Sequence, residues 1–191
     1  MGMKTLLLIC LVALGCHSDV PTANNPNGDH IDVVAKHTPP KTEEDPVVVH
    51  FDKFRVTRSS FDPNTIEGGT ATIEVDLDSL RTDSAERDED LRSPNFINTG
   101  KFHAMTIDVA NVKLKAGKTY TADATVNLRG ATKTYPVTFD VVEQAPDHIR
   151  IKGEQAFSRF DFTVGPVPAN DGHQHIDAEL VIQMVLTIAK P

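Results

Sequence analysis

Residues 71–78 read Ala-Thr-Ile-Glu-Val-Asp-Leu-Asp, so apolar and polar side chains alternate along the segment. Successive side chains of a β-strand point to opposite faces of its sheet, and this alternation therefore predicts a strand with one buried and one solvated face. The same period of two extends over 120–129 and 178–188. Shorter segments of the same kind lie at 30–36, 47–56, 103–114, 135–143, 148–153 and 156–163.

About nine short strands with turn-like spacings predict an all-β fold, and a closed antiparallel barrel accommodates them best. A two-sheet sandwich is the alternative arrangement. Within the segment 103–114 the apolar phase slips between Val109 and Val112, which indicates a β-bulge.

One segment breaks the strand pattern. Asp83 stands at the position of a helix N-cap, Glu86 follows three residues later, and Pro94 prevents a helix from continuing. Residues 84–92 therefore predict a short helix inserted between strands, and we expect it to close one mouth of the barrel.

The composition of the 191 residues argues against several classes of function. The formal net charge is −8 and no basic aromatic patch occurs, so we expect no nucleic-acid partner and favour neutral or amphiphilic ligands. No nucleophile elbow, metalloprotease motif or phosphate-binding loop is present, so we expect neither an enzyme nor a resident cofactor. His173 and His175 offer two ligands to a metal, but two ligands make a weak site and a solvated loop is the expected arrangement.

The N-terminus predicts export. Residues 1–15 combine Lys4, a short apolar run and a final glycine, which is the layout of a secretory signal peptide. Ala13-Leu14-Gly15-Cys16 resembles the lipobox of bacterial lipoproteins, which implies acylation of Cys16 by chains such as palmitate. A plain signal peptide with a chance cysteine is the alternative. Polar residues 16–28 then form a flexible tether to a domain spanning 29–191, and His17 favours the periplasm-facing outer membrane.

Several motifs resemble the YceI family. They are Asp78-Ser79-Leu80-Arg81-Thr82, the run from Arg87 to Phe96, Lys101-Phe102, the segment from Val126 to Lys133, and Phe157-Ser158-Arg159-Phe160-Asp161-Phe162. The resemblance implies an exported, lipocalin-like antiparallel β-barrel, often a homodimer. Its elongated apolar cavity would hold a polyisoprenoid, an isoprenoid quinone or a fatty-acid derivative such as a fatty amide. The chain departs from the family at Asp90, His103 and Thr163, where family members often have His, Pro and Gly.

Inward side chains of such a barrel either fill the interior or surround a ligand, and the sequence leaves both open. The candidates for lining a cavity are Phe51, Phe54, Ile73, Val75, Met105, Ile107, Val126, Leu128, Phe139, Phe160, Phe162, Met184 and Leu186. The leading hypothesis is a non-catalytic envelope lipoprotein that sequesters or transports a long-chain amphiphile. The alternative is a structural or protein-interaction module with a packed interior.

Two arginines are further candidates. Arg87 lies on the predicted mouth helix, where it contacts a ligand head group or pairs with a nearby acid such as Asp83 or Asp88. Arg159 lies beside Phe160 and Asp161 on a predicted strand, and we expect it to point outward toward a neighbouring carboxylate; contact with a ligand is the alternative.

Overall fold

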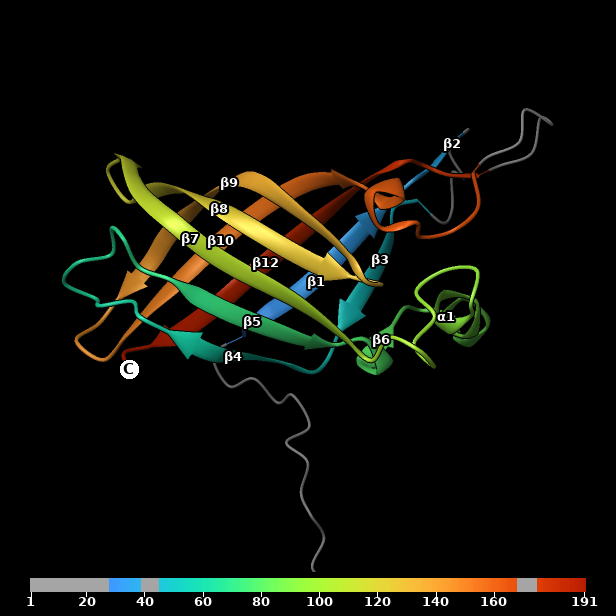
Figure 1. Ribbon diagram of the computed structural model, residues 1–191, viewed down its shortest axis with the longest axis horizontal. Helices are drawn as coiled ribbons and strands as arrows, with labels where there is room; N and C mark the ends of the chain where they lie inside the picture. The colour runs from blue at the N-terminus through green and yellow to red at the C-terminus, as the bar shows by residue number, and fades with distance from the viewer. Residues whose placement is uncertain (1–27, 39–44, 168–174) are drawn as a thin grey trace, which may run out of the picture.

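The computed structural model of the chain describes residues 28–38, 45–167 and 175–191 (Figure 1). Its strands are β1 (His30–Ala35), β2 (His37–Thr38), β3 (Val47–Phe51), β4 (Phe54–Ser59), β5 (Ala71–Asp76), β6 (Leu80–Arg81), β7 (Ala104–Ala116), β8 (Thr119–Leu128), β9 (Ala131–Gln144), β10 (His148–Ser158), β11 (His175–Ile176) and β12 (Glu179–Ala189). The other elements are the helix α1 (Ala85–Arg92) and the 3-10 helices η1 (Leu77–Ser79) and η2 (Arg159–Phe162). The predicted all-β class with a short inserted helix is confirmed.

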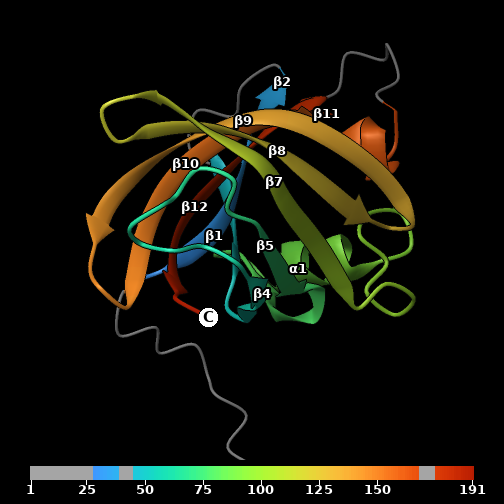
Figure 2. The ribbon, with the colours of Figure 1, turned by 60° about the vertical axis from the view of Figure 1, so that its left-hand side comes forward.

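Ten of the described strands form one antiparallel sheet in the order β4-β5-β7-β8-β9-β10-β12-β1-β3-β6. The sheet is strongly curled, as Figures 1 and 2 show from two sides. Its two ends are held together by the chain itself, because η1 connects β5 directly to β6 and residues 52–53 connect β3 directly to β4. β6 pairs with β3 while β5 pairs with β4, so the predicted antiparallel barrel architecture is confirmed.

Two of the predicted strand segments divide or join differently in the structure. The segment 47–56 contains two strands, β3 and β4, because the chain bends at residues 52–53. The predicted strands 148–153 and 156–163 are instead the single strand β10, which ends at Ser158 and is followed by η2. The bulge between Val109 and Val112 is confirmed by a shift in the β7–β8 register, where Asn111 has a φ of 55°.

Helix α1 lies over one end of the barrel, on the side where η2 also lies (Figure 1). Its N-cap is Ser84, whose side chain accepts a hydrogen bond from the N–H of Arg87, and not Asp83 as predicted. No residue of α1 is fully buried, so the helix is held mainly by polar contacts, with half-buried Leu91 packed against the core. We call the end of the barrel at which α1 and η2 lie the mouth.

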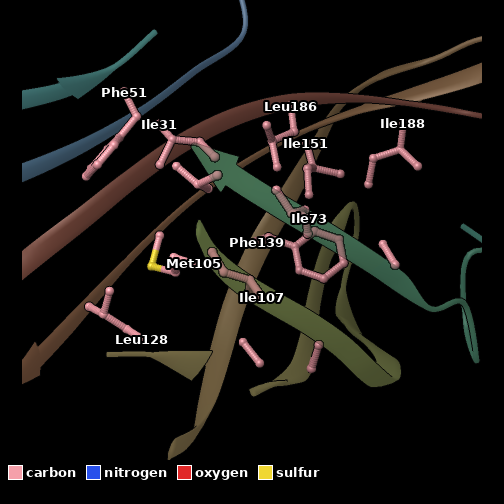
Figure 3. Packing of buried hydrophobic residues seen from close by; sticks show 14 of the residues in the cluster. Ile31, Phe51, Ile73, Met105, Ile107, Leu128, Phe139, Ile151, Leu186 and Ile188 are labelled. Atoms are coloured by element: carbon pink, nitrogen blue, oxygen red, sulfur yellow. The ribbon is translucent and has the colours of Figure 1, made fainter. Parts of the chain in front are cut away.

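The core lies between the inward rows of the strands (Figure 3). Ile31, Val75 and Ile149 are completely buried, and Ile73 and Leu186 are exposed by only 1%. Burying a side chain of this size stabilises the fold by about 1.5–3 kcal/mol relative to leaving it in water. The strands are therefore positioned by an aliphatic core that surrounds the cavity described below.

Within the three described stretches of chain, no helix has both the length and the apolar character that crossing a membrane requires.

Candidate ligand-binding cavity

A cavity of about 330 Å³ lies inside the curled sheet and extends to the mouth. Most side chains of its wall are apolar and come from strands β1, β3, β7, β8, β9, β10 and β12. The apolar wall residues are Val33, Ala35, Val47, Val49, Phe51, Leu77, Leu91, Phe96, Ile97, Met105, Ile107, Ala124, Val126, Leu128, Val137, Phe157, Phe162, Val164, Ile176, Leu180, Ile182 and Met184. We call this space the main cavity.

A second cavity of about 60 Å³, the inner cavity, adjoins the main one. Ile107, Ala124 and Met184 are among the residues that line both cavities, so the two spaces share a wall inside the barrel. Ala124, on β8, contributes only a methyl group to this shared wall. The small side chain is one local reason why space remains there.

The structure distributes the thirteen predicted lining residues over three environments. Seven line the main cavity: Phe51, Met105, Ile107, Val126, Leu128, Phe162 and Met184. Ile73, Phe139 and Leu186 line the inner cavity alone. Phe54, Val75 and Phe160 line neither cavity.

The three residues outside both cavities have different surroundings. Val75 is completely buried in the core. Phe54 is half-buried at the start of β4. Phe160 is on η2 rather than on a strand, and its ring stacks against the guanidinium of Arg159 at 4.2 Å from the ring centroid. A barrel interior therefore includes well-packed positions beside positions that face open space.

Several wall residues were not among the predicted set. Leu180 and Ile182 continue the inward row of Met184 on β12, so the alternation over 178–188 was a signal that could have found them. Phe96 and Val164 come from loops at the mouth, and no periodic signal marks them. The mouth is thus the part of the wall that local pattern predicts least well.

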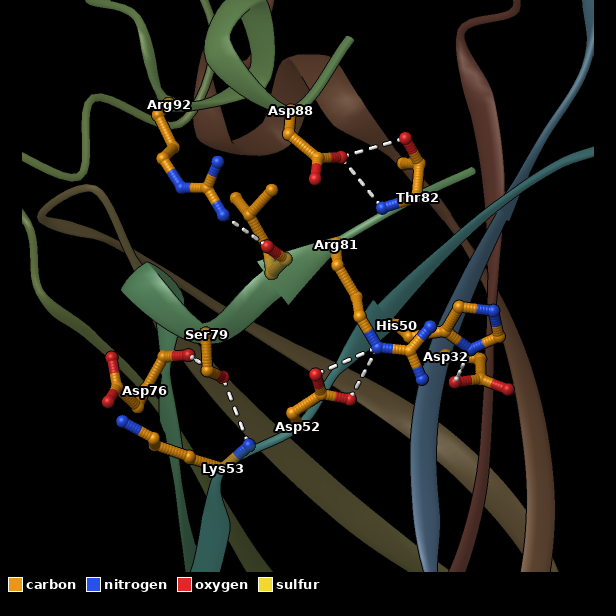
Figure 4. Close-up of polar contacts among 11 residues, drawn as sticks. Asp32, His50, Asp52, Lys53, Asp76, Ser79, Arg81, Thr82, Asp88 and Arg92 are labelled. Carbon is orange, nitrogen blue, oxygen red and sulfur yellow. Dashed lines mark hydrogen bonds and ion pairs between the residues drawn. The ribbon is translucent and has the colours of Figure 1, made fainter. Parts of the chain in front are cut away.

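The motif residues of α1 hold the helix over the mouth. Asp88 accepts hydrogen bonds from the N–H and the hydroxyl of Thr82, both at 2.7 Å, and Arg92 donates to the carbonyl oxygen of Leu80 (Figure 4). These contacts connect α1 to the β6 segment and bring Leu91 to the cavity wall.

Arg87 lines the main cavity and forms an ion pair with Asp83 one turn earlier in the chain. The structure therefore places Arg87 at the mouth, and it also shows the pairing that the sequence offered as the alternative to a head-group contact.

Arg159 differs from the outward position expected for it. Its side chain is 3% exposed, and its guanidinium donates to the carbonyl oxygens of Val164 at 2.6 Å, Pro166 at 2.9 Å and Asp177 at 3.0 Å, as well as to that of Ile176. Burial lowers the pKa of this arginine. Arg159 therefore fixes the loop after η2 to the segment that enters β12, and its partners are carbonyl groups rather than a carboxylate.

A second polar group on the cavity wall is Tyr135 of β9. Its hydroxyl donates to Oδ2 of Asp161 at 2.9 Å, and Nζ of Lys133 lies 3.6 Å from Oδ1 of the same carboxylate. Burial, with the hydrogen bond to Asp161, raises the pKa of Tyr135, so the phenol stays protonated at neutral pH. The wall also includes His37, whose Nδ1 lies 2.6 Å from Oδ1 of Asp45.

The loops on either side of the mouth meet at Arg129, on the turn between β8 and β9. Its guanidinium donates to the carbonyl oxygens of Phe96 and Thr163. Phe96 belongs to the loop after α1, and Thr163 ends η2 with a φ of 53°. A single side chain thus ties both loops to the rim of the sheet.

Comparison with known proteins bears on this architecture. A family model described as the YceI-like domain matches residues 24–188. The chain belongs to the YceI family. A UPF0312 protein of Shewanella denitrificans is 29% identical over 182 residues, which cover 88% of this YceI chain and 94% of the relative.

Two solved structures resemble this YceI barrel. BcnA of Burkholderia cenocepacia superposes with a TM-score of 0.72 and 18% identity, covering 84% of this chain and 96% of that chain. A domain of Saccharophagus degradans described as polyisoprenoid-binding superposes with a TM-score of 0.65 and 16% identity, covering 85% and 94%. These similarities support the lipocalin-like fold of the chain.

Two sequence-based candidates concern residues outside the described chain. Cys16, the signal peptide and the tether up to residue 27 all lie there, and so does His173 of the two-histidine loop. Among the described residues, no group of three or more His, Cys, Asp or Glu side chains is arranged to hold a metal ion.

Proposed function

We propose that this YceI protein is a non-catalytic envelope lipoprotein that holds a long-chain amphiphile in the main cavity for sequestration or transport. The observation that carries the proposal is the cavity of about 330 Å³ with its predominantly apolar wall. A cavity of this volume falls within the range of about 300–1,000 Å³ that ligand pockets span. An alkyl or isoprenoid chain gains about 25 cal/mol for each Å² of apolar surface removed from water.

The residue composition of the wall favours a flexible apolar chain over a planar cofactor. The chain has no tryptophan, and Tyr135 is the one tyrosine on the wall of the main cavity. Met105 and Met184 contribute unbranched side chains that adapt to a flexible occupant. The polyisoprenoid-binding description of the Saccharophagus degradans domain supports the same class of ligand.

Solvent extraction tests the proposal directly. The protein is purified without detergent, extracted with organic solvent and analysed by mass spectrometry, and we expect one long-chain amphiphile per chain. Ala124→Phe places a phenyl ring in the wall shared by both cavities and should abolish this content while the barrel stays folded. Asn127→Phe adds the same ring at an exposed position of the same strand and should leave the content unchanged.

Two results would oppose the proposal. Absence of any lipid in the wild-type extract, together with strong destabilisation by Ala124→Phe, would mean that the interior is packed by its own side chains. The chain would then be a structural or interaction module.

Membrane attachment through an acylated Cys16 is the second part of the proposal. The first described residues lie at the end of the barrel opposite α1 (Figure 1), where the carboxylate of Asp29 accepts hydrogen bonds from the N–H of Thr187 at 2.8 Å and from its hydroxyl at 2.9 Å. The segment from Cys16 to Gly28 reaches at most about 40 Å at roughly 3.3 Å per residue. An anchored barrel would therefore be held by one end, with its mouth at the other.

Fractionation of cells tests the anchor. Wild-type protein should sediment with outer membranes and be extracted by detergent, whereas Cys16→Ser should appear as a soluble periplasmic protein. Continued membrane attachment of the Cys16→Ser protein would contradict the lipoprotein assignment without affecting the cavity.

A further inference from the structure

The polar groups of the main cavity differ in how far their hydrogen-bonding capacity is already used. Two guanidinium groups reach the wall, those of Arg87 and Arg159. Arg159 is buried and donates to four backbone carbonyl oxygens. Arg87 is paired with Asp83, and the imidazole of His37 contacts Asp45. The cationic and imidazole groups of the wall are thus engaged by the protein itself.

The hydrogen-bond acceptors of the wall, in contrast, keep capacity that the protein does not use. Asp90, an exposed residue of α1, is among the residues that line the main cavity, and its carboxylate makes no hydrogen bond or ion pair with any of the described residues. The hydroxyl oxygen of Tyr135 donates its hydrogen to Asp161 and keeps its lone pairs for a further donor. Gln155 donates one of its two amide hydrogens to the carbonyl oxygen of Ala156 at 2.7 Å, and its amide oxygen accepts no hydrogen bond from the described residues.

This asymmetry has a consequence for the head group of an amphiphile. An anionic head group at the mouth would give up part of its hydration without gaining, among the described residues of the wall, a cation that is free to pair with it. It would also be repelled by Asp90. A head group that donates hydrogen bonds finds Asp90, Tyr135 and Gln155 as acceptors on the wall.

We propose that the main cavity selects amphiphiles whose head group donates hydrogen bonds and carries no negative charge, and that Asp90 is the residue that sets this preference. The inference rests on the proposed function, because it concerns the ligand class of the same cavity. It adds that alcohols, amides and amines are accepted while long-chain carboxylates, sulfonates and phosphates are disfavoured.

The test compares three ligands that share one chain. Hexadecan-1-ol, hexadecylamine and hexadecanesulfonate, each below its micellar concentration, displace the neutral fluorescent probe N-phenyl-1-naphthylamine from the full chain carrying Cys16→Ser. We expect the alcohol and the amine to displace the probe at concentrations at least ten-fold lower than the sulfonate.

Two substitutions in α1 test whether Asp90 causes the discrimination against the sulfonate. Asp90→Asn removes the charge from the cavity wall and should reduce the discrimination against the sulfonate several-fold. Glu89→Gln removes the same charge from the neighbouring residue, which is exposed like Asp90 but lines neither cavity, and should change each displacement by less than two-fold.

The outcomes separate the two proposals. Equal displacement by all three ligands, or preference for the sulfonate through release of Arg87 from Asp83, would overturn the charge selectivity and leave the lipid-binding function intact. Equal effects of Asp90→Asn and Glu89→Gln would overturn the role of Asp90. Failure of the probe and of every ligand to bind would overturn the proposed function itself, and the selectivity with it.

Discussion

Tyr135 donates its phenolic hydrogen to Oδ2 of Asp161 at 2.9 Å, which connects strand β9 to η2 at the wall of the main cavity. Tyr135→Phe deletes this bond and leaves Asp161 with Lys133 as its partner. A hydrogen bond of this kind contributes about 1 kcal/mol, so we expect a loss of that size in the free energy of unfolding measured with urea.

The same pair predicts an optical signal. The chain has two tyrosines and no tryptophan, so alkaline titration followed by near-ultraviolet absorbance reports Tyr120 and Tyr135 alone. The raised pKa of Tyr135 should delay its ionisation to a higher pH than that of an ordinary phenol. Tyr135→Phe should abolish the late step, and survival of that step in the variant would contradict the assignment.

Alternation along the strands predicted which face points inward, because that property belongs to the strand itself. It could not predict whether an inward side chain meets a neighbour or open space. Ile73 and Val75 share the inward face of β5 and are both almost completely buried, yet Ile73 lines the inner cavity and Val75 lines neither cavity. That difference depends on which side chains other strands bring opposite, and this information is not local.

The end of β10 shows a second limit. The pairing of β10 with β12 ends at Ser158, whose side chain accepts a hydrogen bond from the N–H of Phe160 and begins η2. Apolar residues on both sides of Arg159 imitate a continuing strand, so the sequence predicted Phe160 as inward and Arg159 as outward. The carbonyl groups that surround Arg159 come from residues up to eighteen positions away, which no local pattern indicates.

Arg159 should be among the most sensitive positions of the fold. Arg159→Met removes donors from four carbonyl groups in a buried region, and hydrogen bonds that involve a charged group contribute about 1.5–3 kcal/mol each, although not additively. We expect a loss of about 3 kcal/mol or more in urea unfolding. Arg55→Met is the control, because Arg55 is exposed and its ion pair with Glu74 contributes at most about 1 kcal/mol. Similar losses in both variants would contradict the structural role of Arg159.

Gly165 is predicted to tolerate no side chain. A Cβ there would lie 2.7 Å from Nη1 of Arg159 and 2.9 Å from the ring of Phe96, and its φ is +73°. Gly165→Ala should therefore displace both neighbours and destabilise the barrel.

Gly117 provides the matched comparison for this substitution. It has a similar φ of +57°, and nothing lies within 4 Å of the position that a Cβ would take, so Gly117→Ala costs only the left-handed backbone conformation, about 1–2 kcal/mol. In thermal unfolding, the midpoint temperature of Gly165→Ala should lie well below that of Gly117→Ala. Equal midpoints would show that the contacts of Gly165 with Arg159 and Phe96 are not tight.

The pH dependence of stability should include a contribution from His148, the first residue of β10. Its Nδ1 lies 2.8 Å from Oδ1 of Asp147, and its Nε2 lies 3.5 Å from Glu143. The hydrogen bond with Asp147 raises the pKa of His148 above its usual value of about 6.5 and lowers the pKa of Asp147. The imidazolium is therefore stabilised in the folded chain.

The directions of the two pKa shifts determine how the stability of the fold depends on pH. The contribution of His148 is complete below about pH 6.5 and is lost as the pH rises through its folded pKa, whereas that of Asp147 is lost as the pH falls below about 4. The pair should stabilise the fold most between these limits, so Asp147→Asn should cost more at pH 5.5 than at pH 8.5. NMR titration of the His148 ring should show a midpoint above 6.5 that falls in Asp147→Asn, and an unchanged midpoint would contradict the pairing.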